Sequence, residues 1–334
     1  MKLLVTTQAV DLDDPILGFM HGWLLAFADR FAEVHVICLR EGRHELPPHV
    51  HVYSLGKEAG KGRLTYLWRF YRFFWRIYFR VRVEYVFFHM GAIYNFLAAP
   101  FFLLRRLFGT RFYWWKAHGH PALKDRLASR FVNRVYTSTE SGYPVDTPKR
   151  HVIGQAIDTN TFVSVDANDP KRVLYVGRIK PIKHLEVFVA VAKTLIPEGY
   201  SFTLVGPIEP GEYGAELVAT AEAAGVNYLG SKTQTELVEL YQTHGIFLNP
   251  SLTHSMDKTV LEAILCGMVP LTANRAFTSL LGKSGLLLAE QTDTEYTKRI
   301  RSLTPERCRA LQAELATRVR TQHSVATFTE RIFG

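Results

Sequence analysis

The sequence predicts an α/β protein with two doubly wound domains. Three observations support this fold class. Short apolar runs alternate with longer segments of helical periodicity, as expected for parallel sheets covered by helices. The length of 334 residues suits two domains of ordinary size. A polar, turn-rich segment at 165–171 separates two such series, and we predict it to be the domain linker.

The first domain is predicted to span residues 1–165. Runs rich in Val, Ile, Leu and aromatic residues indicate strands, and apolar residues three or four apart indicate helices. The predicted strands are residues 2–7, 34–39, 50–55, 85–89, 112–117, 135–138 and 152–153. The predicted helices are residues 21–31, 64–82, 92–108 and 123–133, and a loop is expected at 8–18.

The second domain is predicted to span residues 166–315, followed by a C-terminal helix at 316–334 that is free to cross back to the first domain. The predicted strands are residues 173–177, 201–205, a short one around Tyr228, 246–249 and 270–272. The predicted helices are residues 184–195, 235–243 and 258–266, and residues 304–333 are helical in pattern. Two open parallel sheets place a ligand in a central cleft at the carboxyl ends of their strands.

The positive charge is concentrated in the first half of the chain. Residues 1–150 carry 22 Lys and Arg against 12 Asp and Glu, whereas the remainder carries 18 against 19. This asymmetry suggests an anionic partner for the first domain. The three cysteines, Cys38, Cys266 and Cys308, are scattered, which favours neither a disulfide framework nor a zinc site and indicates the cytoplasm. No apolar run reaches the roughly 20 residues of a membrane-spanning helix.

A basic loop follows the first strand of the second domain. Gly177 permits a tight turn, and Arg178 and Lys183 can converge on one anion near a helix N-terminus. An isolated loop of this kind would be interpreted as a solvated basic turn. Here, however, further short motifs follow at the ends of later predicted strands and at the start of a predicted helix. These are Val205-Gly206, Tyr228-Leu-Gly230-Ser231-Lys232, Asn249-Pro-Ser251 and Val260-Leu-Glu262-Ala-x-x-Cys266-Gly-x-x-Pro270.

These segments, in this order and spacing, resemble the retaining GT-B glycosyltransferases of family 4 (glycosyl transferases group 1) over roughly residues 150–275. Gly154-Gln-Ala-Ile-Asp158-Thr-Asn-Thr-Phe162 is similar to that family's entry to its second domain. The resemblance implies a GT-B fold, with two Rossmann-like domains facing a central cleft. It also implies a nucleotide-diphosphate sugar (UDP- or GDP-linked) as co-substrate on the second domain, an acceptor on the first, and no other cofactor and no metal.

The resemblance assigns roles to residues of this chain. Arg178 and Lys183 would hold the donor diphosphate and act in catalysis. Glu262 would bind the ribose, and Gly230, Ser231 and Lys232 the base. His118, in the segment Trp114-Trp-Lys-Ala-His118-Gly-His120, would contact the donor sugar, although a buried structural histidine is the competing interpretation. The remaining donor-site candidates are Gly18, in the loop after the first strand, Gly177, Gly206, His254, Ser255, Met256, Asp257, Lys258 and Thr259.

One position departs from the family pattern. The family has two glutamates separated by seven residues, and His254 stands where the first is expected. Either His254 contacts the sugar, or it fills the loop while Asp257 supplies a carboxylate. The acidic cluster Asp11-Leu-Asp13-Asp14 lies in the first loop, where polar loop residues are the simpler interpretation than a metal site.

Residues 64–83 form a basic and aromatic helix. Arg69, Arg72, Arg76 and Arg80 are three or four positions apart and share one face. Two interpretations remain open: a helix lying in an anionic membrane surface, or a crossover helix that packs aromatics on the sheet. No recognised nucleic-acid-binding module accompanies the charge, so nucleic acid is not expected.

We therefore predict a metal-independent, retaining hexosyltransferase of cell-envelope glycan biosynthesis. Its acceptor would be a lipid-linked or glycan precursor, and its location the cytoplasm or the inner face of the cytoplasmic membrane. The alternatives are a GT-B phosphorylase or nucleotide-sugar epimerase, and a degenerate transferase domain that acts as a membrane-associated scaffold.

Overall fold

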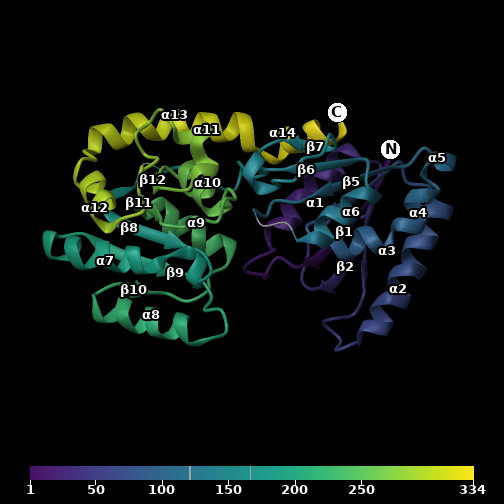
Figure 1. Ribbon diagram of the computed structural model, residues 1–334, viewed down its shortest axis with the longest axis horizontal. Coiled ribbons are helices and arrows are strands. Elements are labelled where there is room, and N and C mark those ends of the chain that lie inside the picture. Colours follow the sequence, from purple (N-terminus) through teal and green to yellow (C-terminus); the bar gives the residue numbers. More distant parts are fainter. Residues whose placement is uncertain (120–121, 166) are drawn as a thin grey trace. The chain divides into compact units, whose positions relative to one another are not determined.

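The computed structural model describes residues 1–119, 122–165 and 167–334, which form two compact units (Figure 1). Unit 1 consists of Met1–Ala156 and Val325–Gly334, and unit 2 consists of Ile157–Ser324. Each unit contains one parallel sheet with helices, so the predicted pair of doubly wound α/β domains is confirmed.

Unit 1 has a seven-stranded sheet in the order β3-β2-β1-β4-β5-β6-β7. The order reverses between β1 and β4, which marks the switch point where doubly wound sheets bind ligands. The strands are β1 (Lys2–Val10), β2 (Glu33–Glu41), β3 (Val50–Ser54), β4 (Tyr85–His89), β5 (Arg111–Trp115), β6 (Arg134–Thr137) and β7 (Arg150–Val152). The helices are α1 (Phe19–Arg30), α2 (Arg63–Arg76), α3 (Ala92–Leu97), α4 (Ala99–Leu103), α5 (Arg105–Phe108), α6 (Leu123–Ala128) and α14 (Val325–Phe333).

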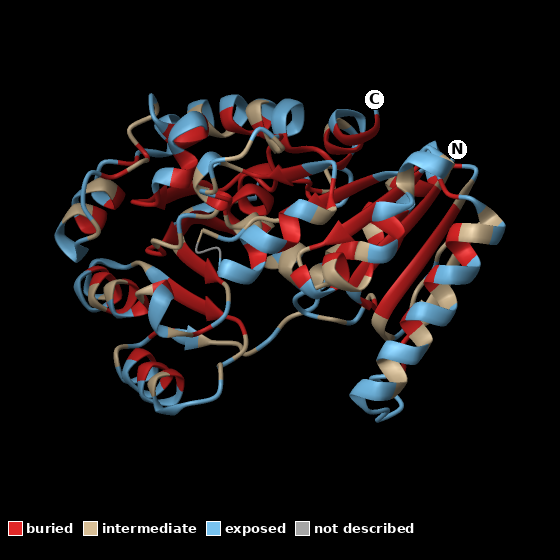
Figure 2. Ribbon diagram, turned by 45° about the vertical axis from the view of Figure 1, so that its right-hand side comes forward, coloured by how far each residue is buried: buried red, intermediate tan, exposed pale blue. Residues whose placement is uncertain are grey.

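The strands of unit 1 are apolar on both sides because helices cover both faces of the sheet. Alternate side chains point to opposite faces of a strand. Val5, Phe87 and Trp115 therefore join the core under α1 and α14, whereas Leu4 and Val86 join the core under α2, α3 and α4. Figure 2 shows the strands buried and the helices exposing one side. This double burial explains the near-continuous apolar runs in the sequence.

Unit 2 has a five-stranded sheet in the order β10-β9-β8-β11-β12, with its switch point between β8 and β11. The strands are β8 (Asp169–Val176), β9 (Ser201–Val205), β10 (Asn227–Tyr228), β11 (His244–Asn249) and β12 (Val269–Thr272). The helices are α7 (Leu185–Leu195), α8 (Glu212–Ala223), α9 (Gln234–Thr243), α10 (Lys258–Leu265), α11 (Thr278–Leu281), α12 (Asp293–Arg301) and α13 (Pro305–His323).

Several predicted boundaries were wrong. The predicted helix at 92–108 is three short helices; Pro100 has no N–H to donate and lies in the first turn of α4, which accounts for the break after α3. The predicted helix at 64–82 ends as α2 at Arg76 and continues as a π-helical turn over Ile77–Val81. Helices α8 and α12 were not predicted. Among the described residues, no helix has both the length and the apolar composition to cross a bilayer.

The unit boundary also differs from the predicted boundary between residues 165 and 166. Ile157 and Phe162 pack into the core of unit 2, so unit 1 ends earlier, at Ala156. The predicted linker segment overlaps the start of β8 at Asp169. The predicted helix at 316–334 is divided at Ser324: α13 belongs to unit 2, and α14 packs in unit 1.

Candidate functional site

Three glycines lie side by side at the carboxyl end of the sheet in unit 2. The Gly177 amide donates to the Val205 carbonyl at 2.9 Å, and the Gly206 amide donates to the Gly230 carbonyl at 2.8 Å. A Cβ atom on Gly206 would lie 1.9 Å from the Gly177 carbonyl oxygen, and Gly206 has a φ of +140°. Glycine at this position therefore permits the ends of β8 and β9 to approach, which leaves backbone rather than side chains on this edge.

Arg178, which follows Gly177, is paired with a carboxylate on the loop after β9. Its guanidinium donates to Glu209 Oε1 at 2.7 Å, and Lys180 Nζ lies 3.4 Å from the same oxygen. The Arg178 side chain is 46% exposed, so it remains accessible to an anion in solution. Glu209 was not among the predicted site residues.

Lys183 connects the two strands that flank the switch point of unit 2. It ends the 3-10 turn Pro181–Lys183 after β8, and its Nζ donates to Asp257 Oδ1 at 2.7 Å and to Ser251 Oγ at 3.4 Å. Asn249 Nδ2 donates to the other Asp257 oxygen at 3.1 Å. The predicted residues Lys183 and Asp257 are thus brought together, beside the end of β11.

Arg178 and Lys183 do not share a partner within the described part of unit 2. Arg178 is held by Glu209, whereas Lys183 is held by Asp257. Their predicted convergence on one diphosphate stays a prediction. Both residues follow the carboxyl end of β8, next to the switch point, and doubly wound sheets bind their ligands at this place.

The loop before α10 carries several of the predicted donor-site residues. His254 is exposed and has a φ of +56°, in the left-handed region that non-glycine residues seldom adopt. The hydroxyls of Thr253 and Ser255 lie 3.2 Å apart, and Asn274 Nδ2 donates to the Ser255 carbonyl at 3.0 Å. Met256 is buried in the core of unit 2, which indicates an anchoring role for its side chain.

Asp257 is the N-cap residue of α10, and Lys258 and Thr259 form the start of that helix. The Asp257 side chain makes no capping bond with the helix amides. Its carboxylate instead receives bonds from Lys183 and Asn249. The amides at this helix start are therefore oriented toward the switch point without a side-chain cap, an arrangement that suits an anion.

Glu262 lies within α10 and is buried. Its Oε2 accepts a hydrogen bond from the Tyr241 hydroxyl at 3.2 Å. Burial raises the pKa of Glu262 to about 7, although Lys258 and the Tyr241 bond oppose this shift. Burial also lowers the pKa of Lys258. The Glu262 carboxyl therefore keeps its proton to higher pH than an exposed glutamate does. Tyr241 was not predicted.

The predicted base-binding loop runs from Gly230 to Lys232. Gly230 has a φ of +66°, and a Cβ atom there would meet nothing within 4 Å. Ser231 is exposed, and Lys232 Nζ pairs with Glu236 Oε1 at 2.9 Å, one turn into α9. This pair stabilises the start of α9, so the Lys232 ammonium has a local structural role.

In unit 1, Gly18 closes the loop after β1 and is the N-cap residue of α1. A Cβ atom on Gly18 would lie 2.8 Å from the Asp14 carbonyl oxygen, so close backbone packing accounts for this glycine. The acidic cluster of the same loop is engaged with arginines: Arg40 binds Asp11 and Asp14, and Arg43 binds Asp13. Within the described residues, no group of three potential metal ligands is found.

His118 lies just after β5 and is exposed, so the alternative of a buried structural histidine is wrong. Its amide donates to the Gly142 carbonyl at 2.6 Å. His120 lies outside the described residues. The proposed sugar contact of His118 stays a prediction.

A hollow of about 440 Å³ lies in unit 1, around the carboxyl ends of β1, β4 and β5. Its polar lining comes from Gln8, Lys116, Lys124 and Asp125, and Lys116 Nζ lies 3.1 Å from Asp125 Oδ1. None of these four residues was among the predicted site residues. Lys116 directly follows β5, and this position at a strand end is the signal that could have revealed it, whereas Gln8 lies within β1 and Lys124 and Asp125 lie on α6.

Comparisons with known proteins agree with this architecture. Residues 170–305 match the family model described as glycosyl transferases group 1. A D-inositol 3-phosphate glycosyltransferase from Rhodococcus jostii is 28% identical over 163 residues, which cover 44% of this chain and 36% of that protein. The aligned part thus spans about a third of the relative's length.

Solved structures match over the whole chain. Sucrose-phosphate synthase from Thermosynechococcus elongatus aligns with a TM-score of 0.76 and 16% identity, covering 100% of this chain and 98% of the other. An alpha-glucosyltransferase in complex with UDP aligns with a TM-score of 0.69 and 12% identity, covering 99% and 98%. The chain therefore has the GT-B fold seen in these glycosyltransferase structures, and residues 170–305 match the glycosyl transferases group 1 model.

Proposed function

We propose that the protein transfers a sugar from a nucleotide-diphosphate sugar to an acceptor hydroxyl. The observation that carries this proposal is the arrangement at the switch point of unit 2. There, a glycine-lined strand edge, the start of α10 and the cations Arg178 and Lys183 occupy the end of the sheet where doubly wound folds bind ligands. The alpha-glucosyltransferase with a similar fold is in complex with UDP, which supports a nucleoside diphosphate as the ligand.

In this proposal the cations stabilise the departing diphosphate. Negative charge grows on the leaving phosphate oxygens as the glycosidic bond breaks, and fixed positive groups lower the barrier. Lys183 is held beside the end of β11 by Asp257 and Ser251, and a bound diphosphate would compete with the Asp257 carboxylate for its ammonium group. We propose that the reaction needs no metal and retains the anomeric configuration. The acceptor hydroxyl would attack from the face that the diphosphate leaves and give its proton to a phosphate oxygen.

The sugar end of the donor is proposed to contact the loop before α10. His254 is exposed at a left-handed turn of that loop, whereas the Asp257 carboxylate is occupied by Lys183 and Asn249. We therefore favour His254 over Asp257 as the sugar contact. His118 is proposed as a contact of the donor sugar because of the family resemblance alone, and Glu262 is proposed to accept bonds from ribose hydroxyls in its charged form.

The acceptor is proposed to bind unit 1 in the hollow lined by Lys116 and Lys124. Two ammonium groups beside one carboxylate favour an acceptor that carries a phosphate or another anion. The match to a D-inositol 3-phosphate glycosyltransferase supports this charge preference. A phosphorylated, lipid-linked precursor of a cell-envelope glycan would fit it, which suggests a peripheral location at the cytoplasmic membrane.

The proposal is tested by Arg178→Ala in a transfer assay with a panel of nucleotide-sugars. We expect kcat/KM to fall roughly 100-fold or more, because a charged contact to the leaving group contributes several kcal/mol in the transition state. NMR of the product's anomeric proton would establish retention. Unchanged transfer by the Arg178→Ala variant would exclude the assigned donor site.

A degenerate domain that no longer binds a nucleotide-sugar and acts as a membrane-associated scaffold is the second candidate. It is favoured by the Glu262 carboxylate, which is buried and already bonded to Tyr241. Thermal unfolding with UDP and GDP separates the two functions, because ligand bound to the folded state raises the melting temperature. If the domain is degenerate, we expect no change in melting temperature with any nucleotide and no sugar transfer.

A further inference from the structure

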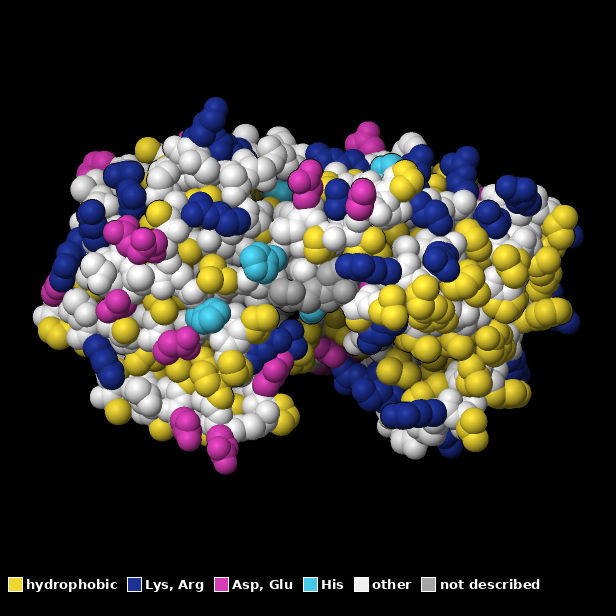
Figure 3. All heavy atoms as spheres, in the orientation of Figure 1, with side chains coloured by type: hydrophobic (Ala, Val, Ile, Leu, Met, Phe, Trp, Pro, Cys, Tyr) yellow, Lys and Arg dark blue, Asp and Glu magenta, His cyan; other side chains and the backbone are white. Residues whose placement is uncertain are grey.

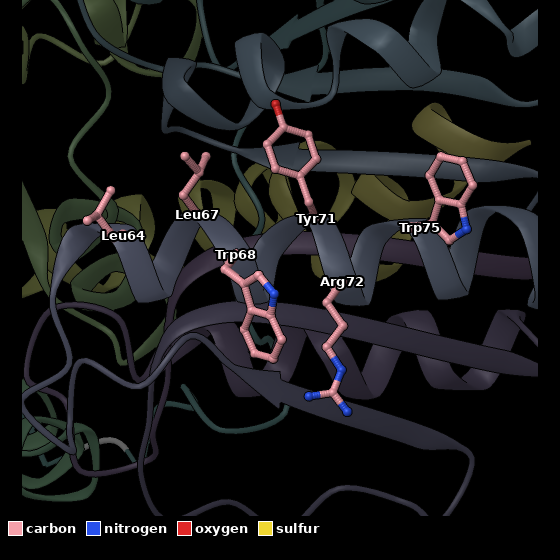
Figure 4. A pocket seen from close by; sticks show the side chains of 6 residues that line it. All are labelled: Leu64, Leu67, Trp68, Tyr71, Arg72 and Trp75. Carbon is pink, nitrogen blue, oxygen red and sulfur yellow. The ribbon is translucent and has the colours of Figure 1, made fainter.

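The outer face of α2 exposes large apolar side chains. Leu64 is 83% exposed, Trp68 59% and Trp75 60%, and with Leu67, Tyr71 and Arg72 they line one shallow hollow (Figure 4). We call this set of six residues the α2 surface. Exposed aromatic and aliphatic residues concentrated on a single helix are uncommon on a monomeric protein and indicate an interaction surface.

The side chains that pack α2 on the sheet lie mainly on its inner face, opposite the α2 surface. The inner face of the helix buries Phe70 and Phe74, and the following turn buries Ile77 and Tyr78. Phe74 also contacts Phe101 of α4, with ring centroids 4.4 Å apart. The two interpretations of this helix are therefore compatible, since its inner face covers the sheet and its outer face remains for a partner.

The exposed apolar surface continues onto α4 and α5. Tyr71 and Trp75 both lie near Phe101 of α4, with ring centroids 6.4 Å and 6.3 Å apart. Beyond Phe101, Leu103 is 70% exposed and Leu107 77%. Figure 3 shows hydrophobic and basic side chains intermingled over this part of unit 1.

The segment that contains this surface is strongly basic. Residues 59–124 contain 12 Lys and Arg and a single acidic residue, Glu84. Arg72 lies over the Trp68 ring at 5.2 Å, and Arg72, Arg76 and Arg80 are all exposed. A partner for this region must therefore carry negative charge and also accept leucine and tryptophan side chains.

We propose that the α2 surface docks on an anionic lipid bilayer. Tryptophan is favoured at the level of the headgroups, leucine in the acyl boundary, and arginine on the anionic headgroups. Nucleic acid offers negative charge but no apolar phase for Leu64, Leu103 and Leu107. This inference does not depend on the proposed sugar transfer, because it concerns only the binding of the α2 surface to a lipid bilayer.

Co-sedimentation with vesicles tests the proposal. Vesicles of equal parts phosphatidylglycerol and phosphatidylcholine are compared with phosphatidylcholine alone, using the full chain, the Arg72→Glu/Arg76→Glu variant and the Trp68→Ser/Trp75→Ser variant. The charge-matched control is Arg309→Glu/Arg320→Glu on α13, where both arginines are also exposed. Circular dichroism and thermal unfolding confirm that each variant is folded.

We expect the full chain and the control to bind the anionic vesicles. Removal of one arginine from an anionic surface weakens binding about fivefold, or ~1 kcal/mol. The Arg72→Glu/Arg76→Glu variant should therefore bind the anionic vesicles about 25-fold more weakly or worse. The Trp68→Ser/Trp75→Ser variant should also lose binding to these vesicles. Equal binding to both vesicle types, or unchanged binding by the folded Arg72/Arg76 variant, would overturn the proposal. Binding to a DNA oligonucleotide without vesicle binding would assign the surface to nucleic acid instead.

Discussion

Replacing Lys183 with methionine is expected to affect stability and donor binding by different amounts. Lys183 Nζ lies 2.7 Å from Asp257 Oδ1, and the two side chains are 10% and 18% exposed. Breaking a buried ion pair from one side costs about 3–5 kcal/mol, because the remaining charge is left uncompensated. Asp257 keeps the bond from Asn249 and some solvent, so we expect a loss of about 2 kcal/mol in the free energy of unfolding.

The second effect is on the diphosphate. A hydrogen bond to a charged group contributes about 1.5–3 kcal/mol, so Lys183→Met should weaken UDP or GDP binding roughly 10- to 150-fold. Asp257→Asn should lower stability too, but it removes a carboxylate that competes with the diphosphate for Lys183. We therefore expect this variant to bind the nucleotide at least as tightly as the wild type.

Urea unfolding gives the stability, and isothermal titration calorimetry gives the nucleotide Kd. Lys193→Met is the matched control, because Lys193 is exposed in the last turn of α7. If Lys183→Met lost stability but bound the nucleotide as tightly as the wild type, the lysine would be structural and the reasoning refuted.

Three further predictions concern pH, backbone geometry and metal. Burial raises the pKa of Glu262 from 4.5 to about 7, so the folded state holds this proton more tightly than the unfolded chain does. The stability that this group contributes is therefore fully present below pH 4.5 and is lost as the pH rises through 7. Over this pH range the free energy of unfolding of the wild type should fall by up to about 3 kcal/mol through this group, and Glu262→Gln should abolish that fall. Gly206→Ala should lower the melting temperature far more than Gly199→Ala, whose Cβ atom would meet nothing within 4 Å. EDTA should leave sugar transfer unchanged.

Each of these predictions has an opposing outcome. Parallel stability–pH curves for the wild type and Glu262→Gln would exclude a perturbed carboxyl at this position. Equal melting temperatures for the two alanine variants would exclude close packing at Gly206. Loss of transfer in EDTA, with recovery on adding Mg²⁺, would contradict metal independence.

Local signals in the sequence predicted most strands and the glycine-lined edge. Gly177, Gly206 and Gly230 each follow an apolar run, and their place at strand ends is a local property. Helix α8 was missed because it is rich in alanine and glutamate, and among its larger apolar residues only Leu217 and Val218 are buried. Its stability comes from tertiary packing that the periodicity does not reveal.

The partners of the site residues could not be predicted in the same way. Arg178 and Glu209 are 31 residues apart, and Lys183 and Asp257 are 74 apart. These pairs form because parallel strands bring distant loops to one edge of the sheet, whereas a motif records only residues close in sequence. The sequence thus singled out Arg178, Lys183 and Asp257, but it did not reveal that Lys183 pairs with Asp257, nor that Glu209 holds Arg178.

The C-terminal helix has a consequence for biosynthesis. Phe328 of α14 packs against Trp23 with ring centroids 4.4 Å apart, and Phe333 lies against Phe31 at 4.9 Å. The first half of the core of unit 1 is thus translated long before the residues that complete it. Domains usually fold in the order of their synthesis. Here unit 2 can fold on the ribosome while the α1 side of unit 1 still exposes aromatic surface, so the nascent chain is expected to need chaperone protection until residues 325–333 emerge.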